Sequence, residues 1–238
     1  MSPVTMTHGA RAVMIPADGV QLAGELAWPQ HPGGMVLFAH GSGSGRLSPR
    51  NRFVAERLRD AGLATLLFDL LTEGEAGDRH NVFDIPLLAR RLVAATTWAA
   101  QQADLAGLPV GYFGASTGAA AALTAAALSP LAAAAIVSRG GRPDLAGNAL
   151  DRVTAPTLLL VGGRDPVVLD LNRAALARLR GPRELVIVPG AGHLFEERGA
   201  MEAVADAAAG WFVRYLELER VWRGAHLRND PSVAAGPW

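Results

Sequence analysis

The chain has 238 residues, a formal net charge of zero and no cysteine, and all 22 of its Lys and Arg residues are arginine. The missing cysteine excludes disulfides, thiolate nucleophiles and Cys-ligated metal sites. The missing lysine excludes a Schiff base, a Walker-A phosphate loop and a Ser–Lys pair.

Half of the residues are hydrophobic and 18% are charged, which suits one α/β domain with a large core. We expect this domain to span residues 1–228, followed by a loose tail over 229–238. The neutral charge predicts no nucleic-acid partner and no anionic membrane partner. No apolar stretch reaches the roughly 18 residues of a transmembrane helix, and no secretory signal opens the chain, so we expect a cytoplasmic protein.

Apolar runs alternate with helical patterns along the chain. The runs that predict strands cover residues 10–15, 20–27, 35–39, 64–70, 109–113, 133–137, 157–161 and 184–188. The patterns that predict helices cover residues 48–61, 84–102, 119–128, 169–179 and 201–223. The first two strands are close enough in sequence to be antiparallel. Strands that alternate with helices predict a mostly parallel sheet covered on both faces.

The segment Gly114-Ala115-Ser116-Thr117-Gly118 fits the pattern G-x-S-x-G and lies between a predicted strand and a predicted helix of small residues. A nucleophile elbow needs this setting, because its sharp turn leaves little room for side chains around the serine. The turn places the serine hydroxyl at the N-terminus of a helix, where developing negative charge is favoured. Ser116 is therefore the candidate nucleophile.

The serine needs a base and an acid. His193 follows the last strand in a glycine-rich loop and is the candidate base, while His40 is interpreted as a structural residue and is the second choice. Asp165 follows a buried strand between serine and histidine, in the order Ser…Asp…His of α/β-hydrolases. Asp144 is a weaker candidate, and Asp69 precedes the serine and fails that order.

An oxyanion hole needs two N–H donors. The backbone N–H of Thr117 is one candidate, and the loop after the strand at 35–39 offers Ser42 first and Gly41 next. The same loop resembles a dinucleotide-binding loop, but Arg46 stands where G-x-G-x-x-G requires glycine. No metal-ligand motif such as H-E-x-x-H is present, so we expect neither a metal site nor a cofactor.

Charged side chains also follow the strands near this site. Arg139 and Arg142 follow one strand, and Glu73 and Glu75 are expected in a loop after another. Arg139 and Glu73 are candidate substrate-binding residues, although structural or surface roles for them remain open. About 18 residues separate the strands at 133–137 and 157–161, which leaves no room for a large cap domain.

The sequence resembles the α/β-hydrolases, and among them the proteins related to dienelactone hydrolase. The resemblance spans roughly residues 13–212 and rests on four segments: 40–44, 114–118, 162–165 and 192–195. It implies an eight-stranded, mostly parallel sheet, a Ser116–His193–Asp165 triad and ester hydrolysis through an acyl-enzyme. Dienelactone hydrolases proper use a cysteine nucleophile, so this chain resembles the serine-dependent members instead.

We therefore expect a serine esterase whose partner is a small-molecule ester. The same triad also serves thioesterases, lactonases, peptidases and acyltransferases, and a non-catalytic binding or assembly module is the alternative outside enzymes. In the long final helix at 201–223, we expect Trp211 to Leu216 to pack on the protein's own sheet, and a homodimer through the later part is a hypothesis. Some similar domains are joined to a phosphoribosyltransferase domain, which nothing in this chain resembles.

Overall fold

The computed structural model describes residues 9–129 and 133–229. Its strands are β1 Gly9–Ala17, β2 Val20–Trp28, β3 Met35–Ala39, β4 Ala64–Phe68, β5 Val110–Ala115, β6 Ala135–Arg139, β7 Thr157–Gly162 and β8 Arg183–Val188. Its α-helices are α1 Pro49–Asp60, α2 Glu73–Ala76, α3 Arg79–Phe83, α4 Ile85–Ala100, α5 Thr117–Leu128, α6 Pro166–Arg178 and α7 Ala200–Asn229. The 3-10 helices are η1 Ala103–Leu105 and η2 Pro143–Arg152. The predicted tail lies outside the described residues, apart from Asn229.

The strands form one eight-stranded sheet in the order β1-β2-β4-β3-β5-β6-β7-β8. Strand β2 is antiparallel to both β1 and β4, and the remaining neighbours are parallel. The predicted antiparallel first pair and the predicted mostly parallel sheet are both confirmed. Because β3 to β8 run the same way, the loops that follow them meet at one edge of the sheet.

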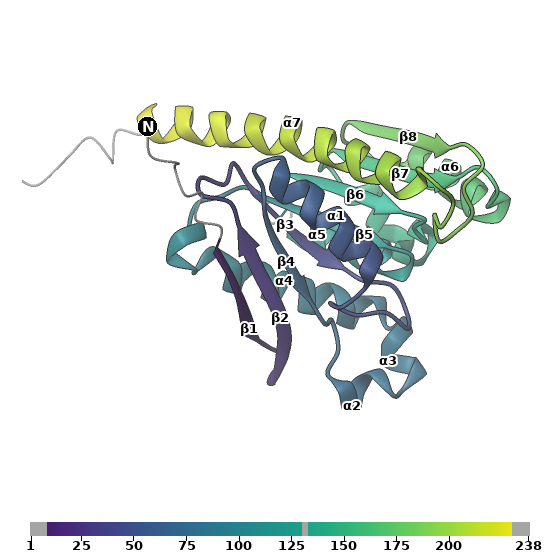
Figure 1. Ribbon diagram of the computed structural model, residues 1–238, viewed down its shortest axis with the longest axis horizontal. Coiled ribbons are helices and arrows are strands. Elements are labelled where there is room, and N and C mark those ends of the chain that lie inside the picture. Colours follow the sequence, from purple (N-terminus) through teal and green to yellow (C-terminus); the bar gives the residue numbers. More distant parts are fainter. Residues whose placement is uncertain (1–8, 130–132, 230–238) are drawn as a thin grey trace, which may run out of the picture.

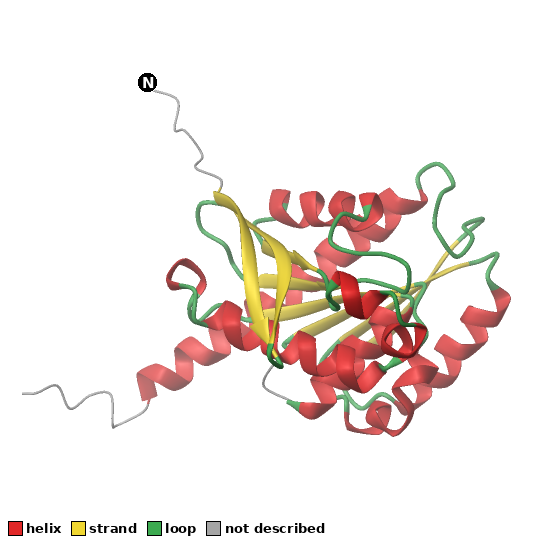
Figure 2. Ribbon diagram, turned by 90° about the horizontal axis from the view of Figure 1, so that it is seen from below, coloured by secondary structure: helices red, strands yellow, loops and turns green. Residues whose placement is uncertain are grey.

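Helices cover both faces of the sheet (Figures 1 and 2). Helices α4, α5 and α6 enclose one buried apolar cluster, which includes side chains from alternate positions of the strands. Helices α1 and α7 enclose a second cluster on the other face. In β6, for example, Ile136 belongs to the first cluster, while Ala135 and Val137 belong to the second. This alternation follows from the two-residue period of a strand.

Helix α7 lies along the sheet for most of its length (Figure 1). Phe212 is fully buried, and a Cβ atom added to Gly111 of β5 would lie 2.6 Å from its ring, so the helix docks directly on a central strand. Trp211 donates from Nε1 to the carbonyl of Pro156 at 3.3 Å. The predicted packing of this part of the helix on its own sheet is therefore confirmed.

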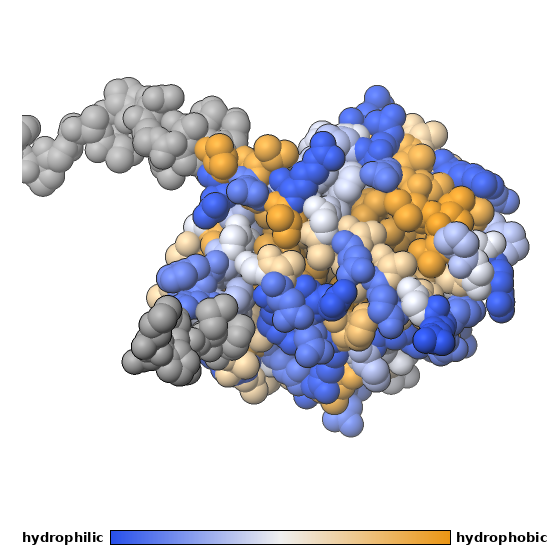
Figure 3. Space-filling model, turned by 45° about the horizontal axis from the view of Figure 1, so that its top comes forward, coloured by the Kyte–Doolittle hydropathy of each residue, from blue (hydrophilic) through white to orange (hydrophobic). Residues whose placement is uncertain are grey.

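The outer side of α7 carries exposed apolar residues, including Leu218 and Val221. Figure 3 shows apolar and charged side chains intermixed on this side of the molecule, with a larger apolar area toward the β8 end. A homodimer through this helix stays a prediction. No helix of the described residues combines the length and the apolar character that a transmembrane span requires.

The connection between β6 and β7 and the segment after β4 determine how far the sheet edge is covered. The one between β6 and β7 contains only the 3-10 helix η2, so no large cap is inserted there. The prediction of a loop around Glu73 and Glu75 is wrong, because this segment forms the short helices α2 and α3. Thr72 and Glu75 form a capping box, with side chain and backbone bonded in both directions. The pattern T-x-x-E that marks this box is visible in the sequence.

Candidate active site

The turn between β5 and α5 forces Ser116 into an unusual backbone conformation. Its φ is 50° and its ψ is −119°, a region that side chains other than glycine rarely adopt and that costs about 1–3 kcal/mol. The Ser116 N–H donates to the carbonyl of Arg139 at 3.2 Å, and the Ser116 carbonyl accepts from the N–H groups of Ala119 and Arg142. The bonds to Arg139 and Arg142 hold the turn against the end of β6 and the loop after it, and the bond to Ala119 joins it to α5.

Three glycines let the backbone close around this turn. A Cβ atom at Gly118 would lie 2.1 Å from the carbonyl oxygen of Ala39, and one at Gly114 would lie 2.5 Å from Cα of Ala119. A Cβ atom at Gly41 would lie 3.0 Å from Cβ of Ser116. The small residues are therefore required by contact between backbones, as the elbow pattern predicts.

His193 and Asp165 come together from the ends of two neighbouring strands. His193 Nδ1 lies 2.7 Å from Asp165 Oδ2. The other carboxylate oxygen of Asp165 accepts the N–H of Val168 at 3.4 Å, so this side chain also caps α6. Arg164 lies near Glu197 instead, at 3.7 Å. One aspartate therefore fixes the first turn of a helix and the imidazole at once, and the Nδ1 contact leaves Nε2 as the nitrogen available for proton transfer.

The end of β6 and the residue after it contact both the serine turn and the histidine loop. The carbonyl of Arg139 accepts the N–H of Ser116, and the next residue, Gly140, lies against the histidine. A Cβ atom at Gly140 would be 3.1 Å from the carbonyl oxygen of His193 and 3.6 Å from its Cε1. The serine turn thus contacts the last residue of β6, and the histidine loop contacts the residue that follows it.

The candidate oxyanion donors occupy the loop after β3 and the start of α5. Thr117 is the first residue of α5, so its backbone N–H has no acceptor within the helix. The N–H of Ser42 donates to the side-chain hydroxyl of Thr117 at 2.9 Å. Ser42 is therefore close to the elbow, but its N–H is engaged and must change partner to hold an oxyanion. Gly41 is buried, and its carbonyl accepts from Ser44 N–H at 3.2 Å.

His40 holds this loop in place, as the sequence interpretation expected. Its Nδ1 lies 3.0 Å from the Gly41 carbonyl and therefore donates, while its Nε2 accepts the N–H of Leu70 at 3.0 Å. The bond in which Nε2 accepts requires the neutral ring, because a protonated Nε2 could only donate. Burial lowers the pKa of His40 below its usual value of 6.5, against smaller opposite effects of the Gly41 carbonyl and Asp69. Both ring nitrogens are thus occupied by backbone groups, which leaves His193 as the stronger candidate base.

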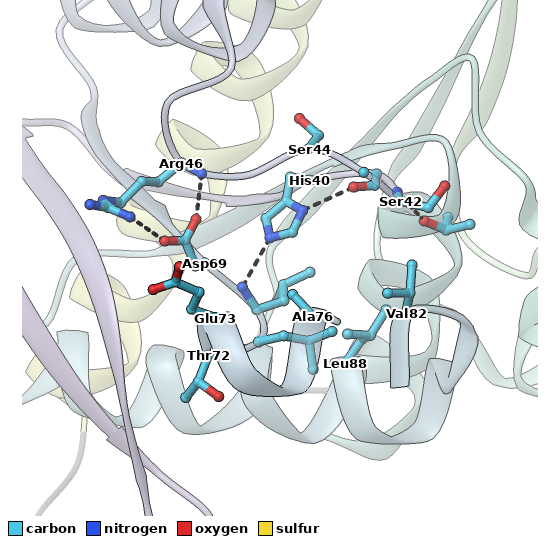
Figure 4. Close-up of a pocket in the computed structure, with 15 residues that line it drawn as sticks. His40, Ser42, Ser44, Arg46, Asp69, Thr72, Glu73, Ala76, Val82 and Leu88 are labelled. Carbon is cyan, nitrogen blue, oxygen red and sulfur yellow. Dashed lines mark hydrogen bonds and ion pairs between the residues drawn. The ribbon is translucent and has the colours of Figure 1, made fainter. Parts of the chain in front are cut away.

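A cavity of about 410 Å³ opens beside this loop (Figure 4). The glycine-rich loop and Thr117 form one wall, and the segment from the end of β4 to the start of α4 forms the other. Its apolar lining consists of Leu70, Leu71, Ala76, Val82 and Leu88. Glu73, a predicted substrate-binding residue, lies on its exposed rim.

Asp69 accepts the Arg46 N–H at 2.7 Å and pairs with the Arg46 guanidinium, which leaves it no role as the triad acid.

A buried arginine fastens the outer wall of this cavity to the sheet. Arg91 is 3% exposed and donates to the carbonyl of Ala17 at 2.6 Å and to Glu75 at 2.8 Å. Glu75 also accepts the N–H of Thr72 within the capping box of α2. The two carboxylate oxygens of Glu75 thus connect α2 with α4, and the position of the cavity wall depends on them.

The remaining candidates have other contacts. Asp144 forms a bidentate pair with Arg142, at 2.9 and 2.7 Å, so neither group is free for the site. Arg139 does not line the cavity of Figure 4, and its side chain contacts Met201 of α7 instead. Nowhere in residues 9–129 and 133–229 do three or more histidine and carboxylate side chains gather closely enough to hold a metal ion.

Comparison with known proteins gives a consistent result. The sequence model of the dienelactone hydrolase family matches residues 23–219. The chain is 60% identical over 204 residues to a Mycobacterium tuberculosis protein named "Putative phosphoribosyl transferase Rv0571c". That match covers 86% of this chain but only 46% of the relative, so the chain spans about half the length of the relative.

Solved structures agree on the fold. The crystal structure of a dienelactone hydrolase from Anabaena variabilis is 56% identical, with a TM-score of 0.85, and the match covers 87% of this chain and 98% of that one. Est1E from Butyrivibrio proteoclasticus has a TM-score of 0.73 at 18% identity, over 86% of this chain and 98% of that one. The expected α/β-hydrolase fold is thereby confirmed.

The close packing of the elbow predicts a large penalty for Gly118→Ala. The added methyl group meets a backbone oxygen that cannot move aside, so we expect a loss of about 1–3 kcal/mol in the free energy of unfolding, measured with urea. Gly210→Ala is the matched control, because Gly210 lies within α7 with nothing near its Cβ position. This control should be neutral or slightly stabilising. Equal stability of the two variants would contradict the packing described.

The neutral His40 ring predicts a pH-dependent stability. Its folded-state pKa is lowered by burial, so the unfolded chain binds a proton more readily than the folded protein does. The contribution of the neutral His40 ring to the free energy of unfolding is complete above pH 6.5 and is lost as the pH falls below that value. We expect His40→Gln to show a smaller drop in thermal midpoint between pH 7.5 and 5.5 than wild type. The exposed His31, changed to Gln, should leave the wild-type drop intact. An unchanged drop in His40→Gln would contradict this assignment.

Proposed function

The chain belongs to the dienelactone hydrolase family, and we propose that it is a serine hydrolase that cleaves carboxylic esters through an acyl-enzyme. The observation that carries the proposal is the 2.7 Å contact between His193 Nδ1 and Asp165 Oδ2, on the sheet edge where the strained turn holds Ser116. The family supports hydrolysis, and the absence of cysteine favours a serine as the nucleophile.

In the proposed first step, His193 Nε2 removes the proton of the Ser116 hydroxyl as Oγ attacks the ester carbonyl carbon. Asp165 orients the ring and stabilises the imidazolium that forms. The carbonyl oxygen becomes an oxyanion, held by the backbone N–H groups of Thr117 and Ser42. For this, the Ser42 N–H turns from the Thr117 hydroxyl, 2.9 Å away, to the substrate oxygen.

Collapse of this intermediate breaks the ester C–O bond, and His193 donates its proton to the departing alcohol. Water then attacks the acyl-enzyme with His193 as base, which releases the carboxylic acid and restores the Ser116 hydroxyl. No step needs a cofactor or an external oxidant.

The cavity of about 410 Å³ supports a preference for a substrate with one apolar group of moderate size. Its floor is aliphatic, and its rim carries Glu73 and the Arg46–Asp69 pair. We propose that Glu73 contacts the substrate at this rim. Thioesters, lactones, peptides and acyl transfer to another acceptor use the same chemistry, so the assay should include a thioester and a lactone.

The name of the longer relative belongs to a protein of about twice this length. We propose that the segment shared with this chain supplies a hydrolase activity there. We further propose that this protein acts in the cytoplasm on small-molecule esters, without nucleic acid or membrane as a partner, and that a homodimer forms through α7. A monomeric mass in light scattering would exclude the dimer.

The proposed roles predict specific losses of activity against p-nitrophenyl acetate and butyrate. We expect Ser116→Ala and His193→Ala to lower kcat by about 10³-fold or more, and Asp165→Asn by about 10²-fold or more. Asp144→Asn is the matched control, because Asp144 is bonded to Arg142 and lies outside the proposed triad; it should keep the wild-type rate.

Turnover by Ser116→Ala at the wild-type rate would contradict the assigned nucleophile. A wild-type protein that turns over none of the esters, the thioester or the lactone would favour the non-catalytic module instead. Rates near wild type for His193→Ala or Asp165→Asn would remove those residues from the triad.

A further inference from the structure

Arg139 is a buried cation without a carboxylate partner. It is the last residue of β6 and is 8% exposed. Its Nε has no hydrogen-bond partner, and its Nη1 lies 3.8 Å from the sulfur of Met201. The described part of the chain places no carboxylate in ion-pair range of this guanidinium. A buried charge in this state is costly unless something pairs with it.

A second arginine lies close to the first. Arg50 is near the start of α1, and its Nε is likewise buried without a partner. Burial, and then the charge of Arg50, lower the pKa of Arg139 to about 10. The two guanidinium groups repel each other, and each has a buried N–H without a hydrogen-bond partner. A shared anion would accept these N–H groups and reduce the repulsion.

A recess of about 310 Å³ lies where α1 and α7 begin, and Arg139 is beside it but is not one of the residues that line it. Arg50 and Met201 both line this recess, and Arg139 contacts Met201. The recess is on the α1 and α7 face of the sheet, because Arg139 follows Val137 in the alternation of β6. It is therefore separate from the cavity of Figure 4, which opens beside α2 and α3.

Three glutamates line the recess together with Arg50 and Arg198, so an anion that binds there competes with these carboxylates for the guanidinium groups. Glu196 lies 3.3 Å from Arg50, but its side chain is 68% exposed and the contact is long. Glu197 is engaged by the N–H of Gly192, at 3.0 and 3.1 Å, and by Arg164. Glu202 also lines the recess, and its charge acts on Arg57. None of the three forms an ion pair with Arg139.

We propose that Arg139 and Arg50 together bind an oxyanion, a carboxylate or a phosphate group, in the recess between the starts of α1 and α7. The planar guanidinium groups suit both kinds of oxygen donor. The proposed anion site is connected to the proposed reaction centre by the backbone of β6. The Arg139 carbonyl accepts the Ser116 N–H, and the next residue, Gly140, contacts His193. The anion is either free in solution or an acidic group of the substrate, and the experiment separates these sources.

The first measurement is thermal unfolding of the whole protein, titrated with inorganic phosphate or succinate at constant ionic strength. We expect a saturable rise of the midpoint in wild type, and an apparent Kd raised about tenfold or more in Arg50→Gln and in Arg139→Gln. Arg57→Gln is the matched control: Arg57 also lies on α1 and pairs with Asp206 of α7, outside the recess. It should bind as wild type does. No saturable rise with either anion, or equal binding by Arg50→Gln and Arg57→Gln, would overturn the proposal. This readout does not depend on ester hydrolysis.

The second measurement identifies the source of the anion. The kcat/KM of mono-p-nitrophenyl succinate is compared with that of the neutral p-nitrophenyl butyrate. If the anion is a substrate group, Arg50→Gln lowers this ratio about tenfold, while Arg57→Gln does not. If the ratio is unchanged and phosphate binding is weakened, the site takes a free anion. Unchanged values in both measurements would show that the recess binds neither.

Discussion

The strained backbone of Ser116 is the constraint on which the rest of the site depends. A φ of 50° at a residue with a side chain is stable only where the surroundings fix the chain on both sides. Here β5 holds it on one side and α5 on the other; Arg139 at the end of β6 accepts its N–H, and Ala119 and Arg142 donate to its carbonyl. The elbow glycines and Gly41 give the space in which these backbones meet. The strained backbone at Ser116 thus lowers the stability of the fold and in return presents the serine hydroxyl at the sheet edge.

The sheet edge then gathers groups that are far apart in the sequence. Asp165 and His193 follow β7 and β8, and the glycine-rich loop follows β3. Because these strands are parallel, their following loops meet without any additional domain. The cavity lies on the side of α2 and α3, and the arginine recess lies on the side of α1 and α7. The proposed reaction centre therefore has a cavity with an aliphatic floor on one side of the sheet and the proposed arginine site on the other.

Much of this arrangement could be predicted from the sequence, because it depends on local patterns. The buried run of β3 and the elbow around Ser116 carry strong signals, since each depends on residue size and on neighbours in the chain. Asp165 could be proposed as the acid from chain order together with its position directly after a buried strand, because Asp144 satisfies the order as well. The same reasoning could not assign the Arg139 side chain, because the face on which it lies depends on the alternation within β6. Nor could it show that the Ser42 N–H is bonded to Thr117, which joins residues 75 positions apart. Helices α2 and α3 were missed, although the T-x-x-E pattern before Ala76 marks a capping box.

The central claim is that Ser116 is an activated nucleophile, and its most direct test is covalent labelling by a fluorophosphonate followed by peptide mass mapping. The account predicts one adduct per chain, on the peptide that carries Ser116, with slow or absent labelling in His193→Ala. An adduct on Ser42 or Ser44 of the neighbouring loop, or no adduct on the wild-type protein, would contradict it.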